Sequence, residues 1–146
     1  MMGRLLGIDH GIARIGVAVS DALGITATEL RVIERKSKVE DFSLLNQIAN
    51  DEGVVAIVVG IPNNDAPEGV HTQADTVRLW IERFQKTTDL AIVEWDEQLS
   101  SEDAKEIARH QRRGVRDAID DLAARVILQS YINAVNDGLA TLPPRT

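Results

Sequence analysis

Residues 54–60 constrain the fold of this chain most, because they form an unbroken apolar run that ends in glycine. A strand with only apolar side chains needs cover on both faces, which is typical of a parallel strand between two helical layers. Apolar residues with helical spacing precede the run over Ser37–Asp51 and follow it over Val70–Lys86. We therefore expect a central strand over Val54–Gly60 with a helix on each side of it in the sequence.

Three further strands are expected before this central strand. Arg4–His10 and Arg14–Ser20 are separated only by Gly11-Ile12-Ala13, and a short spacer that begins with glycine predicts a hairpin. Glu29–Arg35 alternates apolar with charged residues, which is typical of an outer strand. Ser37 and Glu40 then match a capping box at the start of the first helix.

After the central strand, helices and strands alternate. The expected elements are a loop over Ile61–Gly69, a helix over Val70–Lys86, a strand over Leu90–Trp95, and helices over Ser100–Gln111 and Asp117–Asn136. Strands that alternate with helices run parallel through right-handed crossovers. The order predicts an α/β fold: an antiparallel three-strand meander joined to a parallel half, in a five-stranded mixed sheet with helices on both faces.

Composition limits the possible functions. With 146 residues, one domain over residues 1–146 is expected. The absence of cysteine excludes thiolate zinc sites, iron–sulfur clusters and cysteine nucleophiles. The net charge of −7 means that any nucleic-acid role needs a local basic patch or metal cations. The N-terminus is not typical of a secretory signal and no apolar run is long enough to span a membrane, so we expect a cytoplasmic protein.

Acidic residues follow two of the expected strands and open the last helix. Asp9 follows the apolar residues 5–8 at the exit of the first strand, Asp96 and Glu97 follow the last strand, and Asp120 with Asp121 comes early in the final helix. Ligands collect outside the carboxyl ends of parallel strands, so these acids are expected at one edge of the sheet. Converging carboxylates suit Mg²⁺. Two such ions about 3.5–4 Å apart can activate water for phosphodiester hydrolysis.

Each of these acids also has an ordinary structural explanation. Asp9 fits a turn after a strand. Asp96 and Glu97 fit the N-terminus of the following helix through its dipole. Asp120 would occupy the third helical position if Asp117 is the N-cap, where acids stabilise any helix. The residue pattern alone leaves both explanations open.

A basic segment precedes the last two aspartates. The run from Arg109 to Arg116 holds four arginines and no acid, and arginine makes forked contacts with phosphate, although a solvated loop explains the run equally well. The three histidines, His10, His71 and His110, show no metal spacing and are expected at the surface or in the core. The candidates for contact with a substrate are Arg14, Asn63, Arg112, Arg113 and Arg116.

Four segments together resemble one known family, the YqgF (RuvX) family. They are Gly7-Ile8-Asp9-His10-Gly11 with Arg14-Ile15-Gly16-Val17-Ala18-Val19-Ser20-Asp21; Val58-Val59-Gly60-Ile61-Pro62-Asn63; Asp96-Glu97-Gln98-Leu99-Ser100-Ser101; and Asp120-Asp121-Leu122-Ala123-Ala124 with Ile127-Leu128-Gln129-Ser130-Tyr131. Each motif is short, but the four occur in the family's order and cover nearly the whole chain.

The resemblance implies a ribonuclease H-like fold and a nuclease, a hydrolase of phosphodiester bonds, that processes the 5′ end of pre-16S ribosomal RNA. Carried over by motif, the catalytic and metal-binding carboxylates are Asp9, Glu97 and Asp120, with Asp96 and Asp121 as supporting neighbours. The implied cofactors are two Mg²⁺ or Mn²⁺ ions, and the implied partner is nucleic acid. Similarity of the family to RuvC implies an alternative, a Holliday-junction-resolvase-like DNA endonuclease. Monomer and homodimer both remain open.

The chain departs from the family pattern at several cations. Ile12 and Ala13 stand where the family usually has Thr and Lys, Gln98 replaces an Arg, and Ala118 falls where a Lys commonly precedes the last aspartates. Fewer cations weaken phosphate binding, which motivates another hypothesis: a non-catalytic RNA- or ribosome-binding factor. An Asp-x-Gly after the first strand also occurs in actin-like sugar kinases. Those need a second such domain, for which this chain is too short.

Overall fold

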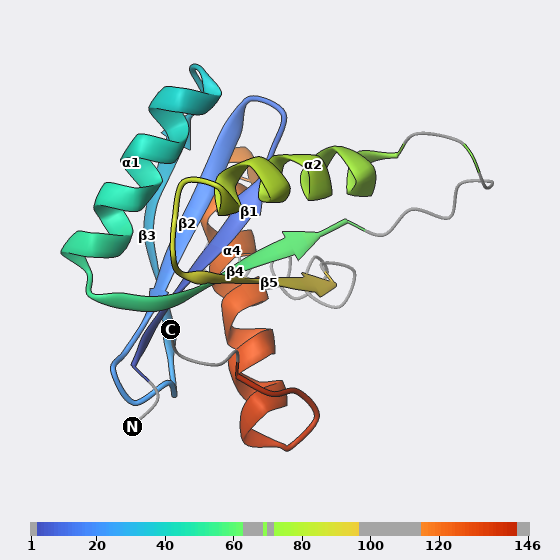
Figure 1. Ribbon diagram of the computed structural model, residues 1–146. Helices are drawn as coiled ribbons and strands as arrows, with labels where there is room; N and C mark the ends of the chain where they lie inside the picture. The colour runs from blue at the N-terminus through green and yellow to red at the C-terminus, as the bar shows by residue number, and fades with distance from the viewer. Residues whose placement is uncertain (1–2, 63–68, 70–71, 97–114, 143–146) are drawn as a thin grey trace.

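A five-stranded sheet in the order β3-β2-β1-β4-β5 forms the centre of the computed structural model, which describes residues 3–62, 69, 72–96 and 115–142 (Figure 1). Strands β1, β2 and β3 pair antiparallel, whereas β4 pairs parallel with β1 and β5 parallel with β4. This confirms the predicted meander joined to a parallel half. The strands are β1 (Arg4–His10), β2 (Arg14–Ser20), β3 (Ala27–Glu34), β4 (Val54–Ile61) and β5 (Ala91–Asp96).

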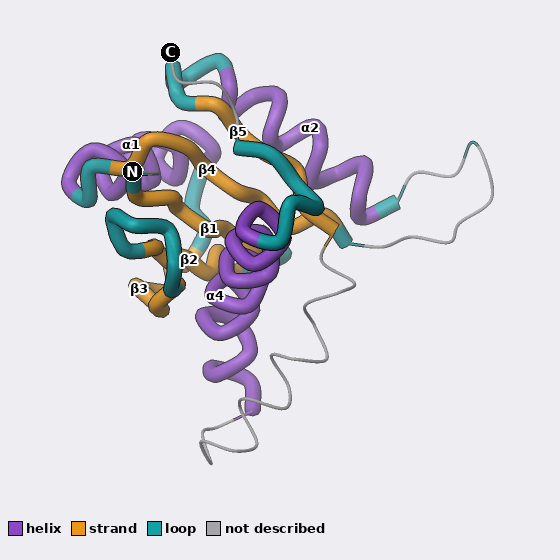
Figure 2. The backbone as a smooth tube through the Cα atoms, turned by 90° about the horizontal axis from the view of Figure 1, so that it is seen from below, coloured by secondary structure: helices purple, strands orange, loops and turns teal. Residues whose placement is uncertain are grey.

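Helices cover both faces of the sheet. On one face lie α1 (Lys38–Asp51) and α2 (Gln73–Gln85), and on the other lies α4 (Val115–Asn136), as the views in Figure 1 and Figure 2 agree. Because β4 lies between these layers, its side chains are buried on both faces, as its apolar sequence predicts. None of the helices in the described ranges combines the length and the apolarity that crossing a membrane requires.

The sequence places two helix starts through their caps. Ser37 caps α1 by accepting a hydrogen bond from the backbone N–H of Glu40. The Glu40 carboxylate accepts a hydrogen bond from the Ser37 hydroxyl, whereas in a complete capping box it would accept one from the Ser37 backbone N–H. Thr72 and Asp75 form a complete capping box, so α2 begins at Gln73, whereas the apolar spacing predicted a start at Val70.

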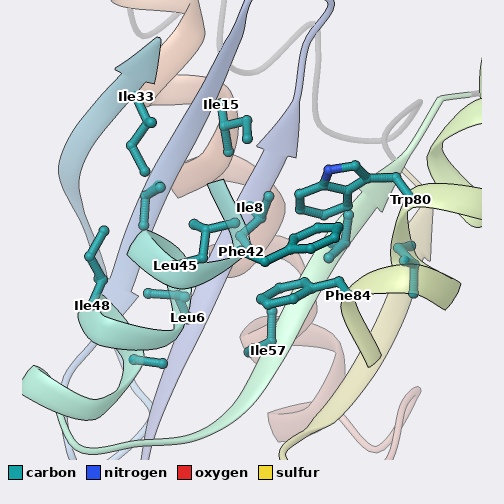
Figure 3. Packing of buried hydrophobic residues seen from close by; sticks show 14 of the residues in the cluster. Leu6, Ile8, Ile15, Ile33, Phe42, Leu45, Ile48, Ile57, Trp80 and Phe84 are labelled. Carbon is teal, nitrogen blue, oxygen red and sulfur yellow. The ribbon is translucent and has the colours of Figure 1, made fainter. Parts of the chain in front are cut away.

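Two apolar clusters fill the space between the sheet and its helices. The cluster under α1 and α2 contains an aromatic group in which the Phe42 and Phe84 rings stack at 5.1 Å and Trp80 lies 5.3 Å from each (Figure 3). The cluster under α4 is built from smaller strand residues, with Ala18 and Ala56 among them. Small side chains allow α4 to lie close to the sheet, and this closeness matters for the site.

Two other expectations need correction or lie outside the described residues. Helix α4 begins at Val115, so Asp117 is not its N-cap and Asp120 is the sixth residue of the helix rather than the third. The stabilising effect of an acid falls off after the first turn, so the dipole explanation for Asp120 loses its basis. The helix expected over Ser100–Gln111 lies outside the described residues.

Candidate active site

The carboxyl ends of the three parallel strands lie level with one another. Ile8 of β1 pairs with Val59 of β4, and Val59 pairs with Glu94 of β5. Asp9, the next residue of β1 and half-buried, therefore lies at the edge of the sheet where β4 and β5 also end. Brought to this edge from three strands, polar side chains can meet one ligand.

Alternation along β1 places Asp9 on the face that α4 covers. Leu5 belongs to the apolar cluster under α4, and Gly7 lies against Leu128 of that helix. Because side chains two residues apart share a face, Asp9 follows them. Arg14 shares this face, since it alternates with Ile15, which lies in the cluster under α1 and α2. The structure thus brings Asp9 and Arg14 to one edge and one face.

Asp96 lies on the opposite face of the sheet. Glu94, two residues before it, receives a hydrogen bond at 3.0 Å from the Nε of Arg78 in α2. Trp95 faces α4 instead, where its Nε1 donates to Ser130 Oγ at 3.1 Å and its ring meets Tyr131 edge-on at 5.3 Å. Asp96 is also the last residue of β5 rather than the first residue after it. Asp9 and Asp96 are therefore separated by the sheet.

Contacts with β3 fix the direction of α4. The Arg125 guanidinium binds the Glu29 carboxylate at 2.8 Å. Four residues later in the helix, Gln129 Oε1 accepts from the backbone N–H of Ala27 at 2.8 Å. Helix numbering rises as β3 numbering falls, so α4 runs antiparallel to β3 and to β1. The first turns of α4, which contain Asp120, therefore lie toward the same edge as Asp9.

Two glycines set how closely α4 approaches the sheet. A Cβ on Gly7 would lie 2.7 Å from Leu128 Cβ and 3.0 Å from the carbonyl oxygen of Ala124. A Cβ on Gly60 of β4 would collide with Ile127 Cδ1. Ala124 lies one helical turn after Asp120, so the contact at Gly7 fixes the height of this part of the helix above β1. A glycine inside an apolar strand is a general signal that a ligand or another backbone approaches closely there.

His10 is a core residue and points away from Asp9. Its ring is only 6% exposed and lies 4.7 Å from the ring of Trp80. Burial lowers the pKa of His10 to about 4, and the positive charge of Arg35 acts in the same direction. Within the described residues neither ring nitrogen of His10 has a hydrogen-bond partner, and the same holds for Trp80 Nε1. This confirms the expectation that His10 is a surface or core residue.

The other predicted site residues fall outside what the structure describes. Glu97, Asn63, Arg112 and Arg113 lie outside the described residues, and in α4 the side chains of residues 115–121, which include Arg116, Asp120 and Asp121, are not described. Among the described side chains no group of three acids or histidines could hold a metal ion. The described part thus supplies one carboxylate, Asp9, whose oxygens suit Mg²⁺ or Mn²⁺.

Comparison with known proteins identifies relatives over nearly the whole chain. The model of the RuvX family, described as Holliday junction resolvase, matches residues 3–134. A protein of Halothermothrix orenii is 39% identical over 140 residues, which cover 91% of this chain and 96% of the relative. A protein of Symbiobacterium thermophilum is 40% identical over 150 residues, which cover 98% of each. Both relatives carry the name "Putative pre-16S rRNA nuclease".

Solved structures show the same fold at low sequence identity. RuvC of Thermus thermophilus in complex with a Holliday junction superposes with a TM-score of 0.64 at 14% identity, covering 95% of this chain and 98% of RuvC. The fowlpox virus resolvase in complex with a Holliday junction gives 0.53 at 10% identity, covering 90% and 98%. These likenesses confirm the expected ribonuclease H-like α/β fold.

Proposed function

The chain belongs to the RuvX family, and from this premise we propose that it is a metal-dependent nuclease that hydrolyses phosphodiester bonds of pre-16S ribosomal RNA, at its 5′ end. One observation in the structure carries this most directly. A half-buried carboxylate, Asp9, stands at the carboxyl edge of the parallel strands on the face where the first turns of α4 arrive. We take residues 1–146 as one nuclease domain that works in the cytoplasm.

We propose Asp9, Glu97 and Asp120 as the catalytic and metal-binding carboxylates. The alternation of β5 supports Glu97 over its neighbour, because Asp96 shares the face of Glu94 and α2, whereas Asp9 is on the α4 face. The start of α4 at Val115 supports a functional role for Asp120, because this aspartate lies beyond the first turn where an acid would stabilise the helix.

The proposed carboxylates would hold two Mg²⁺ or Mn²⁺ ions. Such ions supply an activated water and neutralise charge on the reacting phosphate. The chain's own part is to hold the carboxylate oxygens at fixed positions. For Asp9 this is achieved by β-pairing with Gly16 on one side and, on the other, by the pairing of the preceding residue Ile8 with Val59 of β4.

Substrate binding would rest on arginines around this edge. Arg14 lies on the face and edge of Asp9, and we add Asn63, Arg112, Arg113 and Arg116 by their positions in the sequence. Metal cations and these arginines together would make the site attractive to phosphate in a chain of net charge −7. Nucleic acid is therefore the proposed partner, with monomer and homodimer both compatible.

Cleavage assays with two substrates test this proposal. A labelled pre-16S rRNA fragment and a four-way DNA junction are incubated with Mn²⁺, with EDTA and with the Asp9→Asn variant. We expect cleavage of the RNA that requires metal and is lost in Asp9→Asn. Preferential cutting of the junction would instead support a resolvase, as the family description and the fold suggest. RNA binding in EDTA without any cleavage would support a non-catalytic binding factor.

A matched pair of variants separates the two adjacent acids. Glu97→Gln is expected to abolish cleavage, because it removes a proposed metal ligand. Asp96→Asn changes the same charge one residue away and is expected to keep cleavage within a few-fold of wild type. If Asp96→Asn is the inactive variant, the assignment of Glu97 is wrong.

A further inference from the structure

The turn between β3 and α1 gathers positive charge in an acidic protein. Residues 35–38 are Arg-Lys-Ser-Lys, whereas the chain as a whole carries a net charge of −7. Lys36 and Lys38 are exposed, and within the described ranges neither takes part in a salt bridge. A local group of cations without carboxylate partners is what contact with a nucleic-acid backbone requires.

Hydrogen bonds hold this turn in one conformation. The backbone N–H of Lys36 donates to Oδ1 of Asp41, a carboxylate only 3% exposed, at 3.1 Å. Ser37 Oγ accepts from the Glu40 N–H at 3.1 Å, and the Ser37 carbonyl accepts from the Asp41 N–H at 2.9 Å. Because the backbone is already ordered, binding at Lys36 and Lys38 does not also pay the entropy of ordering the turn.

Arg35 ties the turn to the β1–β2 hairpin beside Asp9. Its backbone N–H donates to the Ala13 carbonyl at 3.0 Å, and its guanidinium donates to the carbonyls of Gly11 and Ile12 at 3.0 and 3.1 Å. The start of α1 and this hairpin lie at the same end of the molecule (Figure 1). β3 lies two strand spacings from β1, or roughly 10 Å. Phosphates bound there would be within a few nucleotides of Asp9.

Two apolar side chains stand exposed on the segments that Arg35 joins. Ile12 in the hairpin is 84% exposed, and Val39 in the first turn of α1 is 80% exposed. At this exposure neither side chain contributes much to the core. Some nucleic-acid-binding proteins insert apolar side chains such as isoleucine between successive bases.

The neighbouring groove between β3 and α1 suits phosphate less well than the turn. It encloses about 310 Å³ and has Lys36 and Arg31 on its walls, but also Glu34, Glu40 and Asp41. Three carboxylates against two cations disfavour an anion inside the groove. A phosphate backbone would instead contact Lys36 and Lys38 from the solvent side of the turn, where both are exposed, and continue onto the hairpin.

We infer that the Arg35–Lys38 turn and the β1–β2 hairpin form a second contact surface for the RNA substrate, in which Lys36 and Lys38 bind phosphates and Ile12 contacts a base. This inference rests on the proposed function, and it adds RNA contacts at Lys36, Lys38 and Ile12 to those proposed around Asp9. RNA fits the surface better than a second copy of this chain does. RNA brings a negative charge at every phosphate, whereas in a two-fold symmetric pair of copies the same lysines would face each other.

Binding of RNA in EDTA tests the surface without any need for cleavage. The probe is a fluorescently labelled single-stranded fragment of the pre-16S rRNA 5′ leader, titrated at 50 to 200 mM salt. For Lys36→Ala/Lys38→Ala we expect Kd to rise on the order of fivefold. We also expect the slope of log Kd against log salt to fall by about 1.4, because each single-strand phosphate contact contributes about 0.7. Ile12→Ala is expected to weaken binding without changing the slope.

The control removes two positive charges elsewhere. Arg83 and Lys86 are exposed at the end of α2, so Arg83→Ala/Lys86→Ala has the same net charge as the test variant and should keep the wild-type Kd and slope. The inference is overturned if the lysine variant binds RNA with the wild-type Kd, or if both double variants lose the same amount of RNA affinity. It is also overturned if the lysine variant converts a dimer to a monomer, since the surface would then join two copies. Absence of cleavage with intact, lysine-dependent binding would refute only the proposed nuclease function.

Discussion

Replacing Gly7 by alanine is expected to lift α4 off β1 and thereby to reduce both stability and cleavage. The added Cβ would lie 2.7 Å from Leu128 Cβ and 3.0 Å from the Ala124 carbonyl oxygen. Carbon atoms in good contact are about 3.5–4.0 Å apart, so the two backbones must separate by roughly 1 Å. No rotamer change relieves this clash, because both atoms are fixed to the helix backbone.

The expected cost follows from two opposing effects. Overpacking of this kind costs about 1–3 kcal/mol. Alanine in a strand recovers about 0.5–1 kcal/mol through the lower entropy of the unfolded chain. The net loss is then about 0–2.5 kcal/mol with a middle value of about 1 kcal/mol, and each kcal/mol lowers Tm by roughly 2–4 °C in a protein of this size. Cleavage should fall much more, on the order of 100-fold, if a shift of about 1 Å displaces Asp120 relative to Asp9.

Urea denaturation in EDTA measures the change in the free energy of unfolding, and RNA cleavage with Mn²⁺ measures the change in activity. Gly60→Ala provides the comparison, because its added Cβ meets the terminal Cδ1 of Ile127, which a smaller side chain lacks. Ile127→Val should therefore partly rescue Gly60→Ala, whereas Leu128→Ala, which keeps its Cβ, should not rescue Gly7→Ala. Wild-type cleavage by Gly7→Ala, or its rescue by Leu128→Ala, would refute this account of how α4 is held.

Three further outcomes are expected. Burial lowers the His10 pKa from 6.5 to about 4, so the folded state binds a proton at His10 less tightly than the unfolded chain does. The contribution of His10 to the free energy of unfolding is therefore present above pH 6.5 and is lost as pH falls toward 4. Between pH 7.5 and 5 this loss is about 2 kcal/mol, and urea titrations of metal-free His10→Leu should lack that share of the pH dependence. Arg125→Ala, which breaks the 2.8 Å pair with Glu29, should cost about 0.5–1 kcal/mol in thermal or urea unfolding, and less in 1 M NaCl; a loss that salt leaves unchanged would argue against a Coulombic role. Arg35→Ala removes the two hydrogen bonds to hairpin carbonyls and should speed amide hydrogen exchange in the hairpin but not in α4. An unchanged exchange rate in the hairpin would show that Arg35 does not hold it in place.

Local patterns were sufficient for most of the fold. The apolar run at 54–60 predicted the central strand, and the glycine-containing spacer at 11–13 predicted the hairpin. Helix starts were less accurate. Apolar spacing extended the second helix back to Val70, but the capping box of Thr72 with Asp75 starts it at Gln73. A cap is a specific hydrogen bond, whereas apolar spacing only reports which residues face the core.

For the candidate site, the sequence by itself indicated that Asp9 lies near the end of a buried strand and that other acids lie near the end of β5 and early in the last helix. It could not determine which acids share a face, because strand ends alone do not say which helix covers which side of the sheet. Only the tertiary structure shows that Asp96 and Asp9 lie on opposite faces of the sheet, that His10 is buried against Trp80, and that α4 packs against Gly7 and Gly60. These outcomes depend on packing between segments far apart in the chain, and a local pattern of residues does not say which distant segment will pack against it.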